Sequence, residues 1–204
     1  MRRLTGVGLT IVVLVGAVAV GYALNGTWAG LTTLHLRWRR LVVAAVLAQT
    51  GGAALGILGV TDPRRGYVLG LALSAICAAA FCVGNISVPG VPLVTLGLAA
   101  NALVVTLNGA MPVSIVAALR AGVPITDIAA GYDARHTVAT SDSTLRALGD
   151  VVPLPLPVRP EVVSAGDVLV AAGLGELVVM GMLRRRLTGS GRRRAVMGDE
   201  PTEE

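Results

Sequence analysis

Two carboxylates, Asp150 and Asp167, flank a proline-rich segment and form the pair in this chain best suited to acid–base chemistry. If the two groups approach each other, only one ionises easily, and such a pair can activate water for hydrolysis of a peptide bond. One carboxylate then acts as the base and the other as the acid. Asp167 also has a structural interpretation, because a carboxylate in the first turn of a helix is stabilised by the unpaired backbone amides and the helix dipole.

A third carboxylate, Glu176, lies near the middle of the last apolar stretch of the chain. A charged side chain costs at least ~2.5 kcal/mol at the centre of a bilayer, so an ionisable residue there is a functional candidate. Glu176 is nine residues from Asp167, which puts the two half a turn out of phase on a helix. We expect Glu176 to be neutral or bonded to Gln49 or Asn101 inside a helical bundle, and the functional alternative is a proton relay.

Two amides, Asn101 and Asn108, are seven residues apart in an earlier apolar stretch and therefore share one helix face. They either hydrogen-bond to a neighbouring helix, in a contact worth ~1 kcal/mol or less, or contact a substrate or an ion. Together with Asp150 and Asp167 they predict a polar mouth at the outer end of the helices.

The sequence predicts no cofactor and no metal site. Its two histidines, His35 and His136, have no other histidine, cysteine or carboxylate at metal-ligand spacing, so we expect them to be solvated or interfacial. The chain also has no phosphate-binding loop, nucleophile elbow or dinucleotide-binding fingerprint.

The elements that must position these residues are membrane-spanning helices. Hydrophobic residues make up 54% of the chain and charged residues 14%, a balance too apolar for a soluble domain. Stretches of about 20 apolar residues, enough to cross a bilayer as a helix, recur five times, at 4–24, 41–60, 66–84, 91–108 and 167–183. Since lipid leaves every backbone polar group to be satisfied within its own segment, we predict an all-α polytopic bundle. Glycines four apart, Gly52/Gly56 and Gly66/Gly70, predict close helix packing.

The chain divides into residues 1–108 with four transmembrane helices, an external cap at 109–165, a fifth helix at 166–186 and a flexible cytoplasmic tail at 187–204. The cap is predicted to be partly helical. Pro112 starts a short helix that ends near Ala121, and two further short helices begin at 126–127 and 141–142, the second of which stops at Gly149. Four closely spaced prolines between 153 and 160 keep the following segment extended.

All seventeen basic residues are arginines, and most lie within a few positions of an apolar stretch. Arginines favour cytoplasmic loops, and with five spans the clusters at 37–40 and 184–194 share one side. We therefore expect a multi-pass protein of the bacterial inner (plasma) membrane, with its N-terminus outside, its C-terminus in the cytoplasm and its arginine-rich tail on anionic lipid headgroups. Because the arginines are explained as topology signals, we expect no nucleic-acid partner. The alternative for the first stretch is a secretory signal cleaved after Ala17-Val18-Ala19.

The chain resembles an uncharacterised bacterial family catalogued only as a domain of unknown function, on a pattern that comprises Asn101, Asn108-Gly109, Met111-Pro112, Leu148-Gly149-Asp150, Ser164 and Gly166-Asp167. This resemblance covers nearly the whole chain and implies a five-span inner-membrane protein with no assigned activity. A fainter similarity is to lipoprotein signal peptidase, and it implies that Asp150 and Asp167 match that enzyme's two catalytic aspartates. The chain departs from the enzyme in having Ser164 where an asparagine precedes the second aspartate, in lacking the Asp-Arg and Asp-Phe signatures, and in having five spans rather than four.

Every polar feature has an adequate structural explanation, so the leading functional interpretation is a membrane binding or assembly protein with an unidentified membrane-protein partner. The alternative is an aspartate-dependent, peptidase-like membrane hydrolase that uses Asp150 and Asp167. A third interpretation is a proton-coupled transporter that uses Glu176. The sequence shows no proline-interrupted helix pair of the kind that forms midplane substrate sites, which argues against transport.

Overall fold

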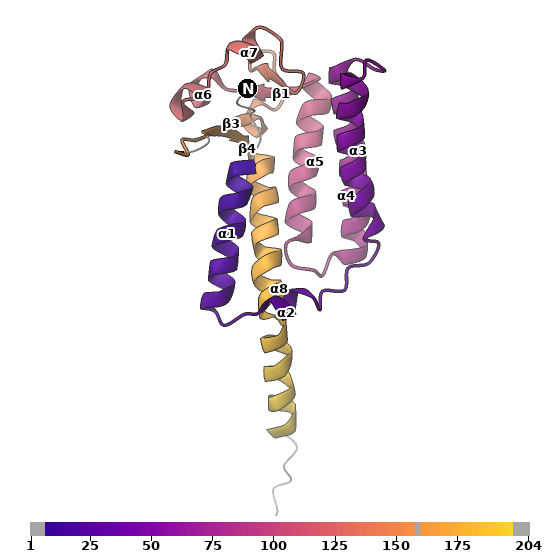
Figure 1. Ribbon diagram of the computed structural model, residues 1–204, viewed down its shortest axis with the longest axis vertical. Helices are drawn as coiled ribbons and strands as arrows, with labels where there is room; N and C mark the ends of the chain where they lie inside the picture. The colour runs from indigo at the N-terminus through magenta and orange to yellow at the C-terminus, as the bar shows by residue number, and fades with distance from the viewer. Residues whose placement is uncertain (1–6, 158–159, 198–204) are drawn as a thin grey trace, which may run out of the picture.

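The computed structural model describes residues 7–157 and 160–197 of the chain. Five apolar helices stand side by side beneath a small cap (Figure 1). They are α1 (Val7–Ala23), α3 (Arg40–Ile57), α4 (Pro63–Asn85), α5 (Val91–Asn108) and α8 (Ala165–Met197), and a single turn, α2 (Trp28–Leu31), links α1 to the segment before α3. Helix α8 packs against α1, α2 and α5, while α4 packs between α5 and α3.

The predicted helical membrane bundle is confirmed. Within the described residues, four helices are long and apolar enough to cross a membrane, namely α3, α4, α5 and residues Ala165–Arg184 of α8. The predicted first span corresponds to α1, a shorter apolar helix of 17 residues. Helix α8 continues to Met197, past the end that we predicted at residue 186, so the first part of the predicted flexible tail is helical. Arginine is a good helix former, and residues 187–197 contain no proline that would stop the helix.

Glycines let the helices approach closely, as the sequence predicted. A Cβ on Gly52 would meet the backbone of Gly66 and Gly70, so the absence of a side chain at Gly52 lets α3 and α4 pack closely. Gly90, at the start of α5, has a positive φ of 86°, and a Cβ there would also meet the backbone of Gly173 in α8. Only glycine meets both requirements without strain, because it has no Cβ.

The cap contains a four-stranded sheet that the sequence analysis did not predict. Its strands are β1 (Met111–Val113), β2 (His136–Val138), β3 (Asp150–Leu154) and β4 (Glu161–Ser164), in the order β2-β1-β3-β4. Strand β1 is parallel to β2 and β3, and β3 is antiparallel to β4. The proline-rich segment is extended as predicted, and it takes part in the sheet through β3.

The short helices of the cap differ in part from the prediction. Helix α6 (Ile115–Ala121) begins three residues after Pro112, because Met111–Val113 joins the sheet and the side chain of Ser114 caps the helix by accepting from Ala117 N–H. Helix α7 (Thr126–Ala129) forms where we predicted it. The helix predicted from 141 to 149 is replaced by turns and a short 3-10 helix, η1 (Arg146–Leu148), which follows the positive φ of Leu145.

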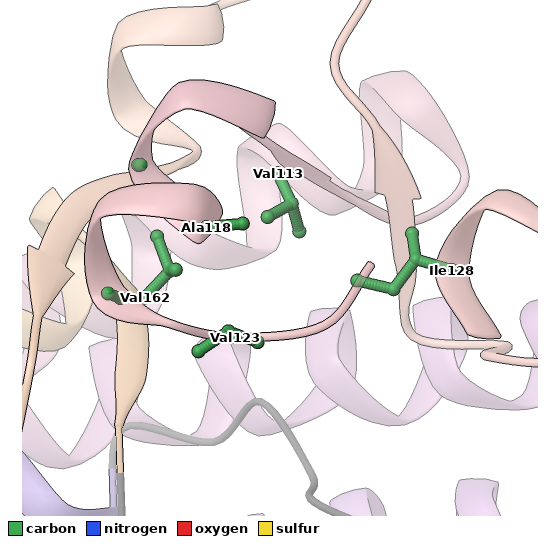
Figure 2. Packing of buried hydrophobic residues seen from close by; sticks show 7 residues of the cluster. Val113, Ala118, Val123, Ile128 and Val162 are labelled. Carbon is green, nitrogen blue, oxygen red and sulfur yellow. The ribbon is translucent and has the colours of Figure 1, made fainter. Parts of the chain in front are cut away.

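An apolar core holds the cap together between α6 and the sheet. Figure 2 shows the side chains of Val113, Ala118, Val123, Ile128 and Val162 pointing toward one another from β1, α6, the loop after it, α7 and β4. These residues are at most 7% exposed. Burial of apolar side chains is the dominant favourable term in folding, so the cap is a folded unit and positions the polar residues at its base.

Candidate functional site

Asn101 joins helix α5 to the start of α8 through two hydrogen bonds. Its Nδ2 donates to Asp167 Oδ1 at 2.8 Å, and its Oδ1 accepts from Ser164 Oγ at 2.8 Å. Asn101 is 8% exposed, and Ser164 is fully buried. A Cβ on Gly166 would collide with the Asn101 amide, so this contact depends on the absence of a side chain there. The hydrogen bond between neighbouring helices that we predicted as one alternative for Asn101 is therefore present.

Asp167 and Ser164 cap α8 reciprocally. Ser164 N–H donates to Asp167 Oδ2 at 3.1 Å, and Asp167 N–H donates to Ser164 Oγ at 3.0 Å. This exchange between a cap residue and the residue three positions later satisfies amides that a helix start leaves unpaired. Both carboxylate oxygens of Asp167 therefore already have partners, one on each side of the α5–α8 junction.

Asp150 lies at the start of β3, where its Cα is the register partner of Ser164 in β4. The strand pairing thus brings Asp150 and Asp167 to the same small region, with Ser164 between them. Asp150 is 3% exposed, and burial raises the pKa of its carboxyl from the ordinary 3.8 to about 7. His136 lowers this pKa, while the nearby carboxylates Asp167 and Asp133 raise it.

His136 is a site residue that the sequence analysis missed. It is 8% exposed, which contradicts the expected solvated or interfacial position. Its Nδ1 lies 2.8 Å from Asp133 Oδ2, and its Nε2 lies 3.7 Å from Asp150 Oδ2. Burial raises the pKa of the Asp133 carboxyl, but its hydrogen bond with His136 and the backbone N–H groups of Arg135 and His136 leave it below the ordinary 3.8. The spacing Asp-x-x-His was the available signal, because it lets the Asp133 side chain reach the imidazole of His136 at the start of β2.

The arrangement Asp133–His136–Asp150 orients an imidazole between two carboxyl groups. The carboxylate at Nδ1 fixes the tautomer and the ring plane, which leaves Nε2 toward Asp150. Such a row can hold and move a proton over a short distance. Among the described residues, no group of three histidine, cysteine, aspartate or glutamate side chains is arranged to hold a metal ion.

Asn108 does not join this cluster. Its Nδ2 donates to Val104 O at 2.7 Å and to Thr144 O at 2.9 Å, and its Oδ1 accepts from Thr144 N–H at 2.8 Å. Asn108 therefore fastens the loop before η1 to the end of α5. It also lines an open pocket of about 330 Å³ together with Leu107, Thr137, Val138, Thr140, Asp142, Ser143 and Thr144. The predicted polar mouth is thus divided into a buried cluster around Asp150 and Asp167 and an open pocket beside Asn108.

Glu176 lies elsewhere, and its predicted partners bond to other residues. Its side chain is exposed on the surface of α8 rather than enclosed in the bundle. Gln49 instead donates to Ser74 Oγ at 3.2 Å, and Asn101 bonds to Asp167 and Ser164. The expected bond of Glu176 to Gln49 or Asn101 is therefore wrong, because the helix rotation set by packing on α1 and α5 turns Glu176 outward.

A second residue missed from the sequence is Glu161, which is fully buried at the start of β4. Its carboxylate accepts from Gly8 N–H at 3.1 and 3.0 Å and from Leu9 N–H at 3.4 Å. Glu161 therefore caps the first turn of α1 from the opposite end of the chain.

Comparison with known proteins adds a family and no activity. The model of a family described as a family of unknown function (DUF5317) matches residues 33–179, which include the buried cluster, the pocket and Glu176. No curated protein and no solved structure matches the chain. The similarity to lipoprotein signal peptidase therefore has no support from these comparisons.

Proposed function

The chain belongs to the family of unknown function DUF5317, and we propose that it is a membrane binding or assembly protein that receives an extended polypeptide segment of a partner at the pocket beside Asn108. One observation supports this most directly. The pocket lies along β2, the edge strand of the cap sheet, and is rich in hydroxyl groups. An edge strand can accept another strand through main-chain hydrogen bonds, while side-chain pockets supply specificity.

The electrostatics of the pocket favour a polar or basic segment. Threonine and serine hydroxyls both donate and accept, so they match the N–H and C=O groups of an extended backbone. Asp142 adds an exposed carboxylate to the pocket lining, and this group can attract a basic side chain. The buried cluster suits a supporting role, since Asp150 is 3% exposed and both oxygens of Asp167 have partners.

The test is site-specific photo-crosslinking in native membranes. A photoreactive amino acid is placed at Thr140 in the pocket, with Tyr132 as the matched control on the same cap, because Tyr132 is 82% exposed and lies outside the pocket. We expect a discrete adduct from position 140, no adduct from position 132, and loss of the adduct when Asn108→Ala releases the pocket loop. Equal labelling from both positions, or none from position 140, would refute the binding role of this pocket.

A second candidate function is an aspartate-dependent membrane hydrolase that uses Asp150 and Asp167. The observation that favours it is the pKa of Asp150, raised to about 7, because a general base works best when its pKa is near the working pH. Perturbed titration is also common at functional sites. The test is mass spectrometry of membrane and surface proteins from cells that carry Asp150→Asn or Asp167→Asn at matched expression. Unprocessed precursors in both variants would establish the hydrolase, and wild-type profiles would eliminate it.

The membrane orientation is part of the same proposal. We infer that the cap faces outward and the arginine clusters face the cytoplasm and anionic lipid headgroups. In support, α2 packs on α8 beside Met182, so the arginines before α3 and those that begin at Arg184 lie at the same end of the bundle, opposite the cap (Figure 1). Impermeant thiol labelling of Ser141→Cys in intact cells tests this orientation. If position 141 is labelled only after the cells are broken, the cap faces the cytoplasm and the proposed orientation is wrong.

A further inference from the structure

One face of α8 remains uncovered along the length of the bundle. Its exposed residues recur every four positions, at Val168, Ala172, Glu176 and Met180. The other faces of α8 are occupied, because α5 approaches at Gly173 and α1 at Gly175. Figure 1 shows α8 between α1 and α5, which leaves this third face free of the chain's own helices.

Glu176 lies near the middle of this face and of the membrane-spanning part of α8. It is the twelfth residue of Ala165–Arg184, so at 1.5 Å per residue it lies roughly 17 Å from the start of a span of about 30 Å. No described side chain bonds to it. Lipid headgroups lie at the ends of the span and do not reach this depth.

Three polar side chains within the spans have partners inside the protein. Gln49 donates to Ser74, Asn101 bonds to Asp167, and Thr95 donates to Ala78 O. Glu176 departs from this pattern although its carboxyl group is the more costly one to leave in lipid. A polar side chain that faces the membrane in the middle of a span therefore points to a helix–helix contact with another chain inside the membrane.

We propose that this face of α8 binds the same face of a second copy of the chain, with the two Glu176 side chains bonded to each other. The symmetry of membrane insertion supports this occupant. Two copies inserted in the same direction are related by a two-fold axis along the membrane normal, so each residue of a shared face meets its counterpart at the same depth. Glu176 of one copy therefore meets Glu176 of the other.

The chemistry of the carboxyl group fits this pairing. An uncharged carboxylic acid has one O–H donor and one acceptor oxygen, so two of them can exchange a reciprocal pair of hydrogen bonds without any other partner. Ala172, one turn away, is small enough to let the two helices approach. The surrounding Val168 and Met180 supply apolar contact above and below the pair. This interface does not involve the cap pocket, so it stands independently of the proposed binding function.

The test is oxidative cross-linking in native membranes of the full chain, with Cys77→Ala and Cys82→Ala as the background. Single cysteines are introduced as Ala172→Cys and Met180→Cys on the proposed face. The matched control is Ile76→Cys, which is 65% exposed at a similar depth on α4. We expect disulfide-linked dimers from positions 172 and 180 and at least tenfold less from position 76.

Two further variants examine the carboxyl pair itself. Glu176→Gln keeps a donor and an acceptor and should leave the cross-linking yield within about twofold, since amides also pair reciprocally. Glu176→Leu removes both groups but remains compatible with a membrane helix, and it should lower the yield about tenfold. Equal yields from positions 76 and 172, an unchanged yield in Glu176→Leu, or adducts only to a different protein would each overturn the proposal.

Discussion

Removal of the Glu161 carboxylate should detach the first helix from the rest of the molecule. Glu161 is fully buried, and its two carboxylate oxygens accept from the backbone N–H groups of Gly8 and Leu9. The two partners are 153 residues apart in sequence, so this contact closes the chain on itself. Glu161→Ala leaves the first turn of α1 without its acceptor and leaves a void at the base of the cap.

The magnitude follows from the geometry. The bond from Gly8 to the carboxylate is charge-assisted, and a hydrogen bond of this kind contributes about 1.5–3 kcal/mol. A negative charge at a helix N-terminus adds about 0.3–1 kcal/mol. Glu161→Ala should therefore cost about 2–4 kcal/mol of unfolding free energy. Glu161→Gln keeps the shape and one acceptor oxygen, and since neutral bonds are about half as strong it should cost roughly 1–2 kcal/mol.

The assay combines two measurements on the protein in detergent micelles. Unfolding by titration with a denaturing detergent, followed by circular dichroism, gives the change in free energy. Hydrogen exchange of the Gly8 and Leu9 amides reports the local detachment of α1, which should accelerate by at least tenfold in Glu161→Ala. The control is Asp142→Ala, which removes an exposed carboxylate from the same cap. If Glu161→Ala changes stability by no more than this control, the capping role assigned to Glu161 is wrong.

Three other perturbations test the buried cluster, the pocket loop and the helix packing. The pKa of Asp150 is raised from 3.8 to about 7, so the contribution of Asp150 to the stability of the folded protein should be greatest below about pH 4 and should fall by roughly 4 kcal/mol as the pH rises to about 7; thermal unfolding should show this loss in the wild type and not in Asp150→Asn. Asn108→Ala removes two hydrogen bonds to the backbone of Thr144, so the free energy of unfolding should fall by about 1 kcal/mol and hydrogen exchange at the Thr144 amide should accelerate. Unchanged exchange would show that the loop is held by other contacts. Gly52→Val should separate α3 from α4 and lower the free energy of unfolding by about 1–3 kcal/mol in the same detergent titration. The control Gly51→Val places its side chain in open space and should lower it much less, and equal losses from the two variants would refute the packing argument.

Much of the architecture could be predicted from local patterns. The apolar stretches fixed the membrane helices because the length of a span is set by the bilayer and is visible in any window of the sequence. The glycine pairs predicted close packing of α3 and α4, and Thr126 marked the start of α7. The pairing of β1 with β2 and β3 could not be predicted, because each strand is only three to five residues long and its partner is distant in the chain.

The candidate site divides in the same way. The sequence placed Asn101 within the fourth apolar helix and Asp167 in the first turn of the last one, as in the structure, but their mutual hydrogen bond depends on how α5 and α8 cross. His136 was expected to be solvated or interfacial because it lies in the cap without residues at metal-ligand spacing, yet the sheet buries it against Asp150. Its burial depends on the pairing of β2 with β1, which no local pattern indicates.

The sequence by itself determined that this is a helical membrane protein with a separate polar cap, because hydropathy acts on each segment independently of its neighbours. Only the tertiary structure decided which polar groups meet. It joined Glu161 to Gly8, placed His136 between Asp133 and Asp150, and turned Glu176 to the exposed surface of α8. These outcomes depend on helix rotation and strand register, and a change of one residue in either would send each side chain to a different face.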